Sequence, residues 1–284
     1  MKFLYYPGCS VKGTAREYEE SFLAAAPALG MQVEEMKGWV CCGATVAKSV
    51  DRKLSQALPL QNLRQPNPER LDWVTLCPSC HMNHQNLLKG AEAGGACAEE
   101  PAFSSPPRIK QILEVLAYDL GPEEIRMRVR RPLRGLRVLP YYGCLVIRPF
   151  ALGGKESLEN PRAMEKLIDA VGAVPVFSPE RLDCCGGGLL LSKEKTALRM
   201  GGSILRAAKR HAPDCLLTAC PLCHFMLDAK QRTLERETGE KIGLPVLYLT
   251  QLLGLALGID PPRLGFSRLI TSPRGLLKKV QAPG

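Results

Sequence analysis

Closely spaced cysteines are the residues of this sequence best suited to chemistry. Two adjacent cysteines followed by glycine occur twice, as Cys41-Cys42-Gly43 and Cys184-Cys185-Gly186. Neighbouring side chains normally point apart, so both thiols reach one bound group only if the backbone turns sharply. Glycine permits such a turn and lets the backbone approach a ligand closely. The sequence therefore predicts two tight turns lined by thiols.

Each pair belongs to a five-cysteine pattern that occurs twice. A lone cysteine in an aromatic, glycine-containing turn precedes the pair, and a Cys-Pro-x-Cys-His segment follows it. The spacing from the pair to this segment is 34 residues in both copies. The first set comprises Cys9, Cys41, Cys42, Cys77 and Cys80, and the second comprises Cys144, Cys184, Cys185, Cys220 and Cys223. Such a repeat indicates an internal duplication.

Cys-x-x-Cys at the start of a helix presents two sulfurs to one centre, and the helix N-terminus stabilises the thiolate form. Zinc would use four cysteines of each set and leave the fifth unexplained. Iron–sulfur clusters are usually held by four thiolates. Five thiolates, two of them adjacent, indicate a cluster other than a plain cubane. In this interpretation one sulfur of the pair could lie between two irons.

The totals exclude several other classes of protein. Twelve cysteines would suit a secreted disulfide framework, but we see no signal-peptide pattern, and Cys-x-x-Cys pairs suit metal better. Apolar runs fall short of the roughly 18 residues that span a membrane, so we expect a cytoplasmic protein. The net charge of +10 comes without a nucleic-acid recognition motif. The basic run from Arg126 to Arg137 is interpreted as an exposed linker, with docking of an acidic partner as the alternative.

Short apolar runs that alternate with amphipathic segments must position these cysteines. Thr14 and Glu17 form a capping-box pattern at the start of a helix, and Ile109 to Leu120 has helical spacing. The expected strands comprise residues 2–6, 31–36, 71–76, 137–141, 174–177, 215–218 and 246–249. Two further helices are expected at residues 52–64 and 193–211. Two more are expected to begin near residues 78 and 160, and a last one is expected to end at residue 257. Residues 94–107 are expected to form a surface loop, and residues 260–284 an extended tail.

Strands that alternate with helices predict an α/β fold, with two pseudo-repeat domains that each contain a small, mainly parallel sheet. Ligand sites in such sheets form at the carboxyl ends of the strands. All three cysteine blocks of each repeat follow expected strands, so they should converge there. The expected domains are residues 1–125 and 136–284, the second with the C-terminal tail, joined by a basic linker at 126–135.

The duplicated pattern resembles the Cys-Cys-Gly (CCG) domain family, and most closely the B subunit of heterodisulfide reductase. The resemblance covers Lys2 to about Pro273. It implies that each five-cysteine set binds one noncubane [4Fe–4S] cluster and that the two clusters face a disulfide substrate. Residue by residue, it assigns all five cysteines of the first set to one cluster and all five of the second set to the other.

The resemblance implies a catalytic subunit of a heterodisulfide-reductase-like complex that reductively cleaves, or forms, a disulfide. We see no flavin, nicotinamide or ferredoxin-type motif, so a ferredoxin-like C-type subunit and a flavoprotein are the implied partners. The alternative is a non-catalytic electron-transfer or anchoring subunit of a succinate- or lactate-type oxidoreductase, where one motif can hold zinc. A polar, solvent-open cavity between the clusters would favour the enzyme, and a closed contact would favour electron transfer.

A few residues outside the ten cysteines are also considered. His81 and His224 directly follow the last cysteine of each set and are catalytic candidates as proton donors or cluster hydrogen-bond partners; a position on the helix surface or behind the ligands is favoured. Tyr6 and Tyr142 are expected to pack beside the clusters. Residues expected to have only structural roles are Cys97, Cys215, His84 and His211.

Basic side chains near the motifs fit an anionic disulfide, although ordinary surface charge explains each one equally well. They are Lys12, Lys48, Arg148, Lys193 and Lys195.

Overall fold

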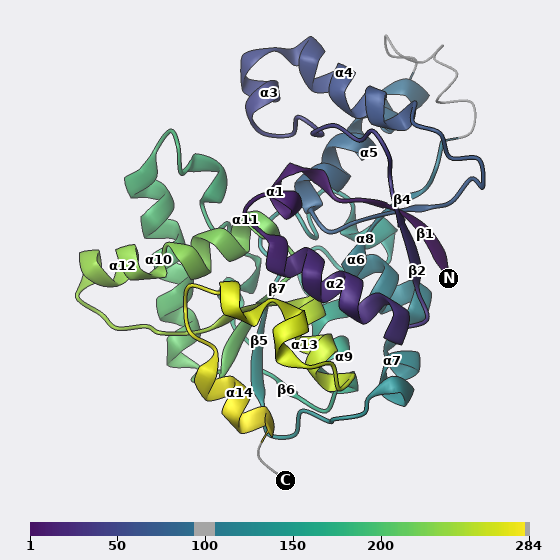
Figure 1. Ribbon diagram of the computed structural model, residues 1–284. Coiled ribbons are helices and arrows are strands. Elements are labelled where there is room, and N and C mark those ends of the chain that lie inside the picture. Colours follow the sequence, from purple (N-terminus) through teal and green to yellow (C-terminus); the bar gives the residue numbers. More distant parts are fainter. Residues whose placement is uncertain (94–105, 282–284) are drawn as a thin grey trace.

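Two four-stranded parallel sheets form the framework of the protein. The computed structural model describes residues 1–93 and 106–281 (Figure 1). The strand orders are β2-β1-β3-β4 and β6-β5-β7-β8, and all neighbouring strands run parallel. The first sheet contains β1 (Lys2–Tyr6), β2 (Gln32–Glu35), β3 (Trp73–Thr75) and β4 (Ile109–Gln111). The second contains β5 (Arg137–Tyr141), β6 (Val174–Pro175), β7 (Cys215–Thr218) and β8 (Val246–Tyr248). The predicted α/β fold is confirmed.

Burial explains the strand order. The central strands β1, β3, β5 and β7 are almost wholly buried, as expected when helices cover both faces of a parallel sheet. The edge strand β2 has the sequence Gln-Val-Glu-Glu and is largely exposed. Charged residues suit an edge because they discourage pairing with another chain.

Helices follow nearly every strand. The first repeat contains α1 (Gly8–Lys12), α2 (Arg16–Ala28), α3 (Val46–Val50), α4 (Arg52–Leu63), α5 (Pro78–Glu92), α6 (Ile112–Glu114), the π-helix η2 (Val115–Leu120) and α7 (Pro122–Arg128). The second contains α8 (Ala151–Gly154), α9 (Ala163–Ala170), η3 (Pro179–Leu182), η4 (Gly187–Leu189), α10 (Glu194–Arg210), α11 (Pro221–His224), the π-helix η5 (Phe225–Ala229), α12 (Gln231–Thr238) and α13 (Leu249–Ala256). The C-terminal segment adds η6 (Pro261–Leu264), η7 (Phe266–Arg268) and α14 (Arg274–Gln281).

Three local expectations were wrong. Residues 109–111 form β4 rather than the start of a helix, because short apolar runs fit a buried strand as well as a helix. The expected capping box of Thr14 and Glu17 does not form: α2 begins at Arg16 with Ala15 as its N-cap, and Glu17 is buried. Residues 260–281 contain three short helices rather than an extended tail, since Leu264, Phe266 and Leu276 are buried in the core.

The predicted loop at 94–107, with Cys97, lies almost entirely outside the described residues. In the basic segment between the sheets, the arginine side chains at 126, 130, 131, 134 and 137 are exposed, as expected. Its backbone is nevertheless tied down, because the amides of Arg130 and Arg131 donate to the Ala256 carbonyl and Leu133 is buried. In the described part of the chain, no helix is long and apolar enough to cross a membrane.

The two repeats share one large core. Helix α2 of the first repeat lies beside α13 of the second (Figure 1), and α9 of the second packs on α6 and η2 of the first. The ring of Tyr18 stacks on that of Tyr248 with centroids 3.9 Å apart, and Tyr248 stacks on His224 at 4.1 Å. This exchange of helices joins the two repeats through their cores.

A buried hydroxyl pair across this interface provides a test. Ser21 Oγ lies 2.6 Å from Thr250 Oγ1, and both side chains are almost fully buried. We expect Ser21→Ala to lower the free energy of unfolding by about 1–3 kcal/mol, because it leaves a buried hydroxyl unpaired. Adding Thr250→Val should recover part of that loss in urea denaturation. If the double variant loses the sum of both single effects, the two hydroxyls do not interact.

Candidate functional site

The five cysteines of the first set lie together, as the spacing predicts. Cys41 Sγ is 3.4 Å from Cys9 Sγ, and Cys42 Sγ is 3.3 Å from Cys80 Sγ. Hydrogen-bonding contacts also join Cys41 to Cys42 and Cys77 to Cys80. Cys77 is the N-cap of α5, so two of the five sulfurs come from a helix start at the carboxyl end of β3. The thiols therefore form one continuous chain of contacts.

The second set repeats this arrangement. Cys144 Sγ is 3.8 Å from Cys184 Sγ. Cys185 contacts both Cys184 and Cys223, and Cys223 contacts Cys220, which is the N-cap of α11. All ten cysteines are free thiols, and only Cys9 and Cys184 among them are exposed. Two similar thiol groups thus lie in one chain, each mostly buried.

The glycine after each cysteine pair makes the sharp turn possible. Gly43 has a φ of +71° and Gly186 a φ of +80°, a region that residues with a Cβ rarely adopt. Their amide nitrogens each lie 3.4 Å from the sulfur of the first cysteine of the pair, Cys41 or Cys184. Amide contacts of this kind favour the thiolate form.

A second glycine in each repeat leaves room for sulfur. Gly8 and Gly143 precede the lone cysteines and have φ values of +73° and +62°. A Cβ at Gly8 would lie 2.9 Å from Cys80 Sγ, and one at Gly143 would lie 3.1 Å from Cys223 Sγ. The backbone therefore forms a cradle against the thiol group that any larger residue would fill.

A tyrosine hydroxyl braces each cysteine turn. The Tyr6 hydroxyl donates to the Val40 carbonyl at 2.7 Å, and the Tyr141 hydroxyl donates to the Asp183 carbonyl at 2.6 Å. Val40 and Asp183 directly precede the two cysteine pairs. The expected position of Tyr6 is correct, but Tyr141 rather than Tyr142 is its counterpart.

Tyr142 faces a different part of the second repeat. Its hydroxyl donates to the Glu165 carboxylate and accepts from the Met164 amide at 2.8 Å. The expectation was wrong because the two aromatic segments align on Gly8 and Gly143, which pairs Tyr142 with Pro7.

The pKa is lowered at the second cysteine of each pair and, through a hydrogen bond from Cys80, at Cys77. Hydrogen bonds from the thiols of Cys41 and Cys80 lower the pKa of Cys42 to about 5, and those from Cys184 and Cys223 lower the pKa of Cys185 to about 4. Cys80 and Cys223 donate these hydrogen bonds to Cys42 and Cys185, and donation raises their own pKa well above the usual range. The second cysteine of each pair therefore favours the thiolate form in both sets.

A soft donor set of five cysteine sulfurs with a backbone cradle fits an iron–sulfur cluster. It fits a mononuclear ion less well. Within residues 1–93 and 106–281, no group of three or more His, Cys, Asp or Glu side chains is arranged for a single metal ion. A larger bound group would require the sulfurs to move apart and surround it.

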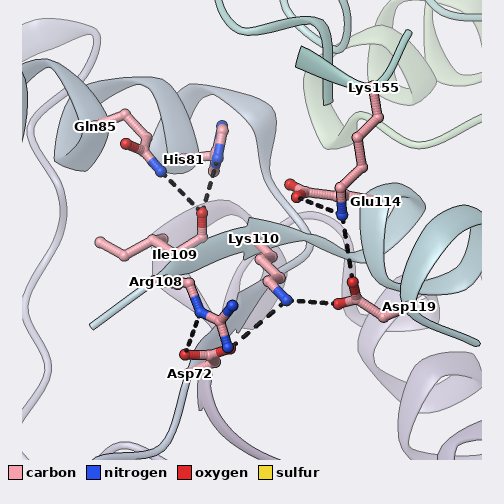
Figure 2. Close-up of polar contacts among 9 residues, drawn as sticks. All are labelled: Asp72, His81, Gln85, Arg108, Ile109, Lys110, Glu114, Asp119 and Lys155. Atoms are coloured by element: carbon pink, nitrogen blue, oxygen red, sulfur yellow. Dashed lines mark hydrogen bonds and ion pairs between the residues drawn. The ribbon is translucent and has the colours of Figure 1, made fainter. Parts of the chain in front are cut away.

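Both histidines behind the cysteine sets are tied to the backbone. His81 Nε2 donates to the Ile109 carbonyl, and His224 Nε2 donates to the Val246 carbonyl, both at 3.0 Å. Gln85 donates to the same Ile109 oxygen, as Figure 2 shows. Burial lowers the pKa of each ring to about 4. The rings are not on the helix surface but tether the cysteine-bearing helices to β4 and β8.

Sequence reasoning missed two asparagines that hold the first cysteine turn. Asn62 accepts from the Val40 amide at 2.8 Å and donates to the Val40 carbonyl at 3.1 Å. Asn83 donates to the Cys42 carbonyl at 2.5 Å. Asn83 lies one helical turn after Cys80, which is the one sequence signal for its role. Asn62 lies in α4, and no local sequence pattern indicates its contact with Val40.

The other residues considered from the sequence lie outside the two thiol sets. Cys215 is fully buried in β7, and His84 is buried between Tyr6 and Trp73, in accord with structural roles. Lys12 pairs with Glu19 and Glu35. The remaining basic residues of the anionic-substrate hypothesis are exposed: Lys48, Arg148, Lys193 and Lys195.

A cavity of about 690 Å³ lies between the two repeats. Its walls include residues next or next but one to cysteines of both sets: Ser10, Ala44, Gly187 and Pro221. It is open to solvent rather than a closed contact. Its surface is mostly apolar, however, whereas a polar cavity was expected for an enzyme.

Known proteins share this organisation. The CCG family, described as "Cysteine-rich domain", matches residues 3–84 and 138–228. The chain is 33% identical to the 8-methylmenaquinol:fumarate reductase membrane anchor subunit of Wolinella succinogenes, over 94% of this chain and 95% of that protein. It is 29% identical to the B subunit of the ferredoxin:CoB-CoM heterodisulfide reductase of Methanosarcina mazei, over 98% of this chain and 97% of that one.

One solved structure has a similar fold. It is the crystal structure of a hypothetical protein from Helicobacter pylori, with a TM-score of 0.71 and 9% sequence identity. The match covers 95% of this chain and 52% of that chain, so the present chain spans about half its length. At this identity the likeness concerns the fold alone.

Gly186 offers a direct test of the turn geometry. A Cβ there would lie 2.8 Å from the backbone Cα and O of Ala197 in α10. With its positive φ, Gly186→Ala should lower the free energy of unfolding by at least about 2 kcal/mol.

Gly188→Ala is the matched control, because a Cβ at that position meets nothing within 4 Å. Its effect on urea denaturation should stay within about 0.5 kcal/mol. Equal effects of the two substitutions would show that the turn does not depend on glycine at 186.

Proposed function

Because the chain belongs to the family of proteins with a duplicated CCG cysteine-rich domain, we propose that it is the iron–sulfur catalytic subunit of a heterodisulfide-reductase-like complex. The observation that carries this proposal is the presence of two complete five-thiol sets beside one solvent-open cavity. The similarity to the B subunit of a heterodisulfide reductase over nearly the full chain supports it.

Each five-cysteine set is the proposed ligand group for one noncubane [4Fe–4S] cluster. The first cluster would be held by Cys9, Cys41, Cys42, Cys77 and Cys80, and the second by Cys144, Cys184, Cys185, Cys220 and Cys223. Support comes from the free thiols, the low pKa of Cys42 and Cys185, and the glycine cradles.

The proposed reaction is two-electron cleavage of a disulfide, or its reverse. Two electrons enter, the S–S bond breaks, and two thiolates form that each take up a proton from water. When bound, the clusters would supply the electrons and stabilise the product sulfurs. The chain itself places residues next to both thiol sets in the wall of one cavity. Cys185, Cys220 and Cys223 of the second set pack in the core that the repeats share, whereas Cys42, Cys77 and Cys80 pack in a smaller cluster of the first repeat.

Complex formation is part of the proposal. The relatives are named as subunits of larger reductases. We propose that electrons arrive from a ferredoxin-like C-type subunit, which receives them from a flavoprotein, in the cytoplasm. The proposed domains are residues 1–125 and 136–284. His81 and His224 would then act as positioning residues rather than proton donors, since each Nε2–H is committed to a backbone carbonyl.

A second candidate is a subunit of a quinol-linked fumarate or succinate reductase. The observation that favours it is the 33% identity to a subunit of an 8-methylmenaquinol:fumarate reductase. In this alternative the chain passes electrons or anchors a complex without cleaving a disulfide, and one of its sites could hold zinc.

The metal content separates these possibilities. We expect about eight irons and eight acid-labile sulfides per chain after anaerobic purification. Stoichiometric zinc without sulfide at both sites would contradict the proposal. Zinc at one site only would favour the succinate-type alternative.

The ligand assignment is tested by substitution. Cys41→Ser and Cys185→Ser should each lose or convert one cluster, halving the iron content or changing the EPR spectrum. Cys215→Ala is the matched control, since this buried thiol lies in β7 outside both sets. The assignment fails if Cys215→Ala strips iron as thoroughly as Cys41→Ser does.

Catalysis is tested in the assembled complex, supplied with a low-potential reductant and a panel of small disulfides. Thiol release should require both cysteine pairs and survive Cys215→Ala. If no disulfide in the panel is cleaved while electrons still pass through the subunit, the electron-transfer alternative is correct.

A further inference from the structure

The cavity between the repeats has walls without charge. Among the described residues that line it, none carries a charged side chain. Its apolar lining includes leucines 190, 191 and 222 with Val50 and Phe225. The Ser49 and Ser192 hydroxyls donate to the backbone carbonyls of Thr45 and Leu189, which reduces the polarity that they offer to a ligand.

The two most exposed large apolar side chains of the described structure lie at this cavity. Leu191 is 96% exposed and Val50 is 76% exposed. They come from opposite repeats, one after each cysteine turn. Contiguous exposed apolar side chains usually mark a binding surface. Their placement on both sides of the cavity indicates a ligand that contacts both repeats.

Neither basic candidate of the first repeat lines this cavity. Lys12 is engaged by Glu19 and Glu35. Lys48 lines a separate cavity with Arg52 and Asn83. An anionic ligand in the cavity would lose hydration without gaining an ion pair from its walls, which is costly.

We propose that the cavity takes an uncharged, predominantly apolar molecule that accepts or yields two electrons, such as a neutral disulfide or a quinone. This inference rests on the proposed function, since it takes the cavity between the thiol sets as the substrate site. It replaces the anionic substrate suggested by the basic residues of the sequence. The volume of about 690 Å³ suits such a molecule, because ligand pockets are typically about 300–1,000 Å³.

A matched pair of probes tests the charge preference. Dithiodipropionate is a dianion, and its dimethyl ester is neutral with the same disulfide. We expect the ester to bind the full, anaerobically purified iron-containing chain at least about tenfold more tightly, measured by calorimetry. Equal or tighter binding of the dianion would overturn the inference, and so would binding of neither probe.

Substitutions at the cavity mouth localise the effect. The double variant Val50→Lys, Leu191→Lys should lose the preference for the ester, because two cations then flank the entrance. Both positions are exposed, so unchanged iron content and circular dichroism should confirm folding. Met127→Lys is the matched control: Met127 is 74% exposed on α7, away from the cavity, and its variant should bind like the parent protein.

Two results of this experiment would contradict the site. A double variant that still prefers the ester places the ligand elsewhere. A double variant that fails only to assemble with partner subunits, with ester binding intact, makes the apolar mouth a protein interface instead.

A third probe keeps this inference separate from the proposed reaction. Menadione is a neutral quinone, and it should compete with the ester for the same cavity if ligand charge decides binding. Competition together with failure of the complex to cleave any disulfide supports the uncharged ligand and favours the quinol-linked function. If the complex cleaves the dianion and the chain shows no preference for the ester, the inference is overturned while the proposed disulfide reaction is supported.

Discussion

The structure depends on one constraint: two adjacent cysteines must direct their sulfurs to the same place. Extended backbone would send them to opposite sides, so the chain turns at a glycine with positive φ, at Gly43 and again at Gly186. A hydroxyl from the first strand of each sheet, Tyr6 or Tyr141, holds the residue before each pair. The parallel sheet then brings the other three sulfurs to the same edge, since the carboxyl ends of its strands lie together.

The duplication places two such cysteine turns in one chain, and the two repeats pack against each other. Helix α2 packs on α13 across the pseudo-symmetric interface, and the stack of Tyr18, Tyr248 and His224 runs from one repeat to the other. His224 also belongs to the segment that carries Cys220 and Cys223. The packing that joins the repeats is thus the packing that positions the second thiol set.

Much of this could be predicted from the sequence. The duplication, the parallel α/β sheets and the convergence of the ten thiols follow from cysteine spacing and from strands placed before each block. Predictions failed where two local patterns compete or where distant packing decides. Residues 109–111 fit a helix by spacing but pair with β3 as a strand. Asn62 braces the first turn from α4, far away in sequence, and the apolar cavity arises from residues that share no motif.

Anomalous diffraction at the iron edge from anaerobically grown crystals would test the central claim most directly. The account predicts two iron centres, one within each thiol set, each contacted by all five of its cysteines and separated by the cavity lined by Val50 and Leu191. A zinc edge at both positions, or four sulfurs around a centre with one cysteine of the set turned away, would contradict it.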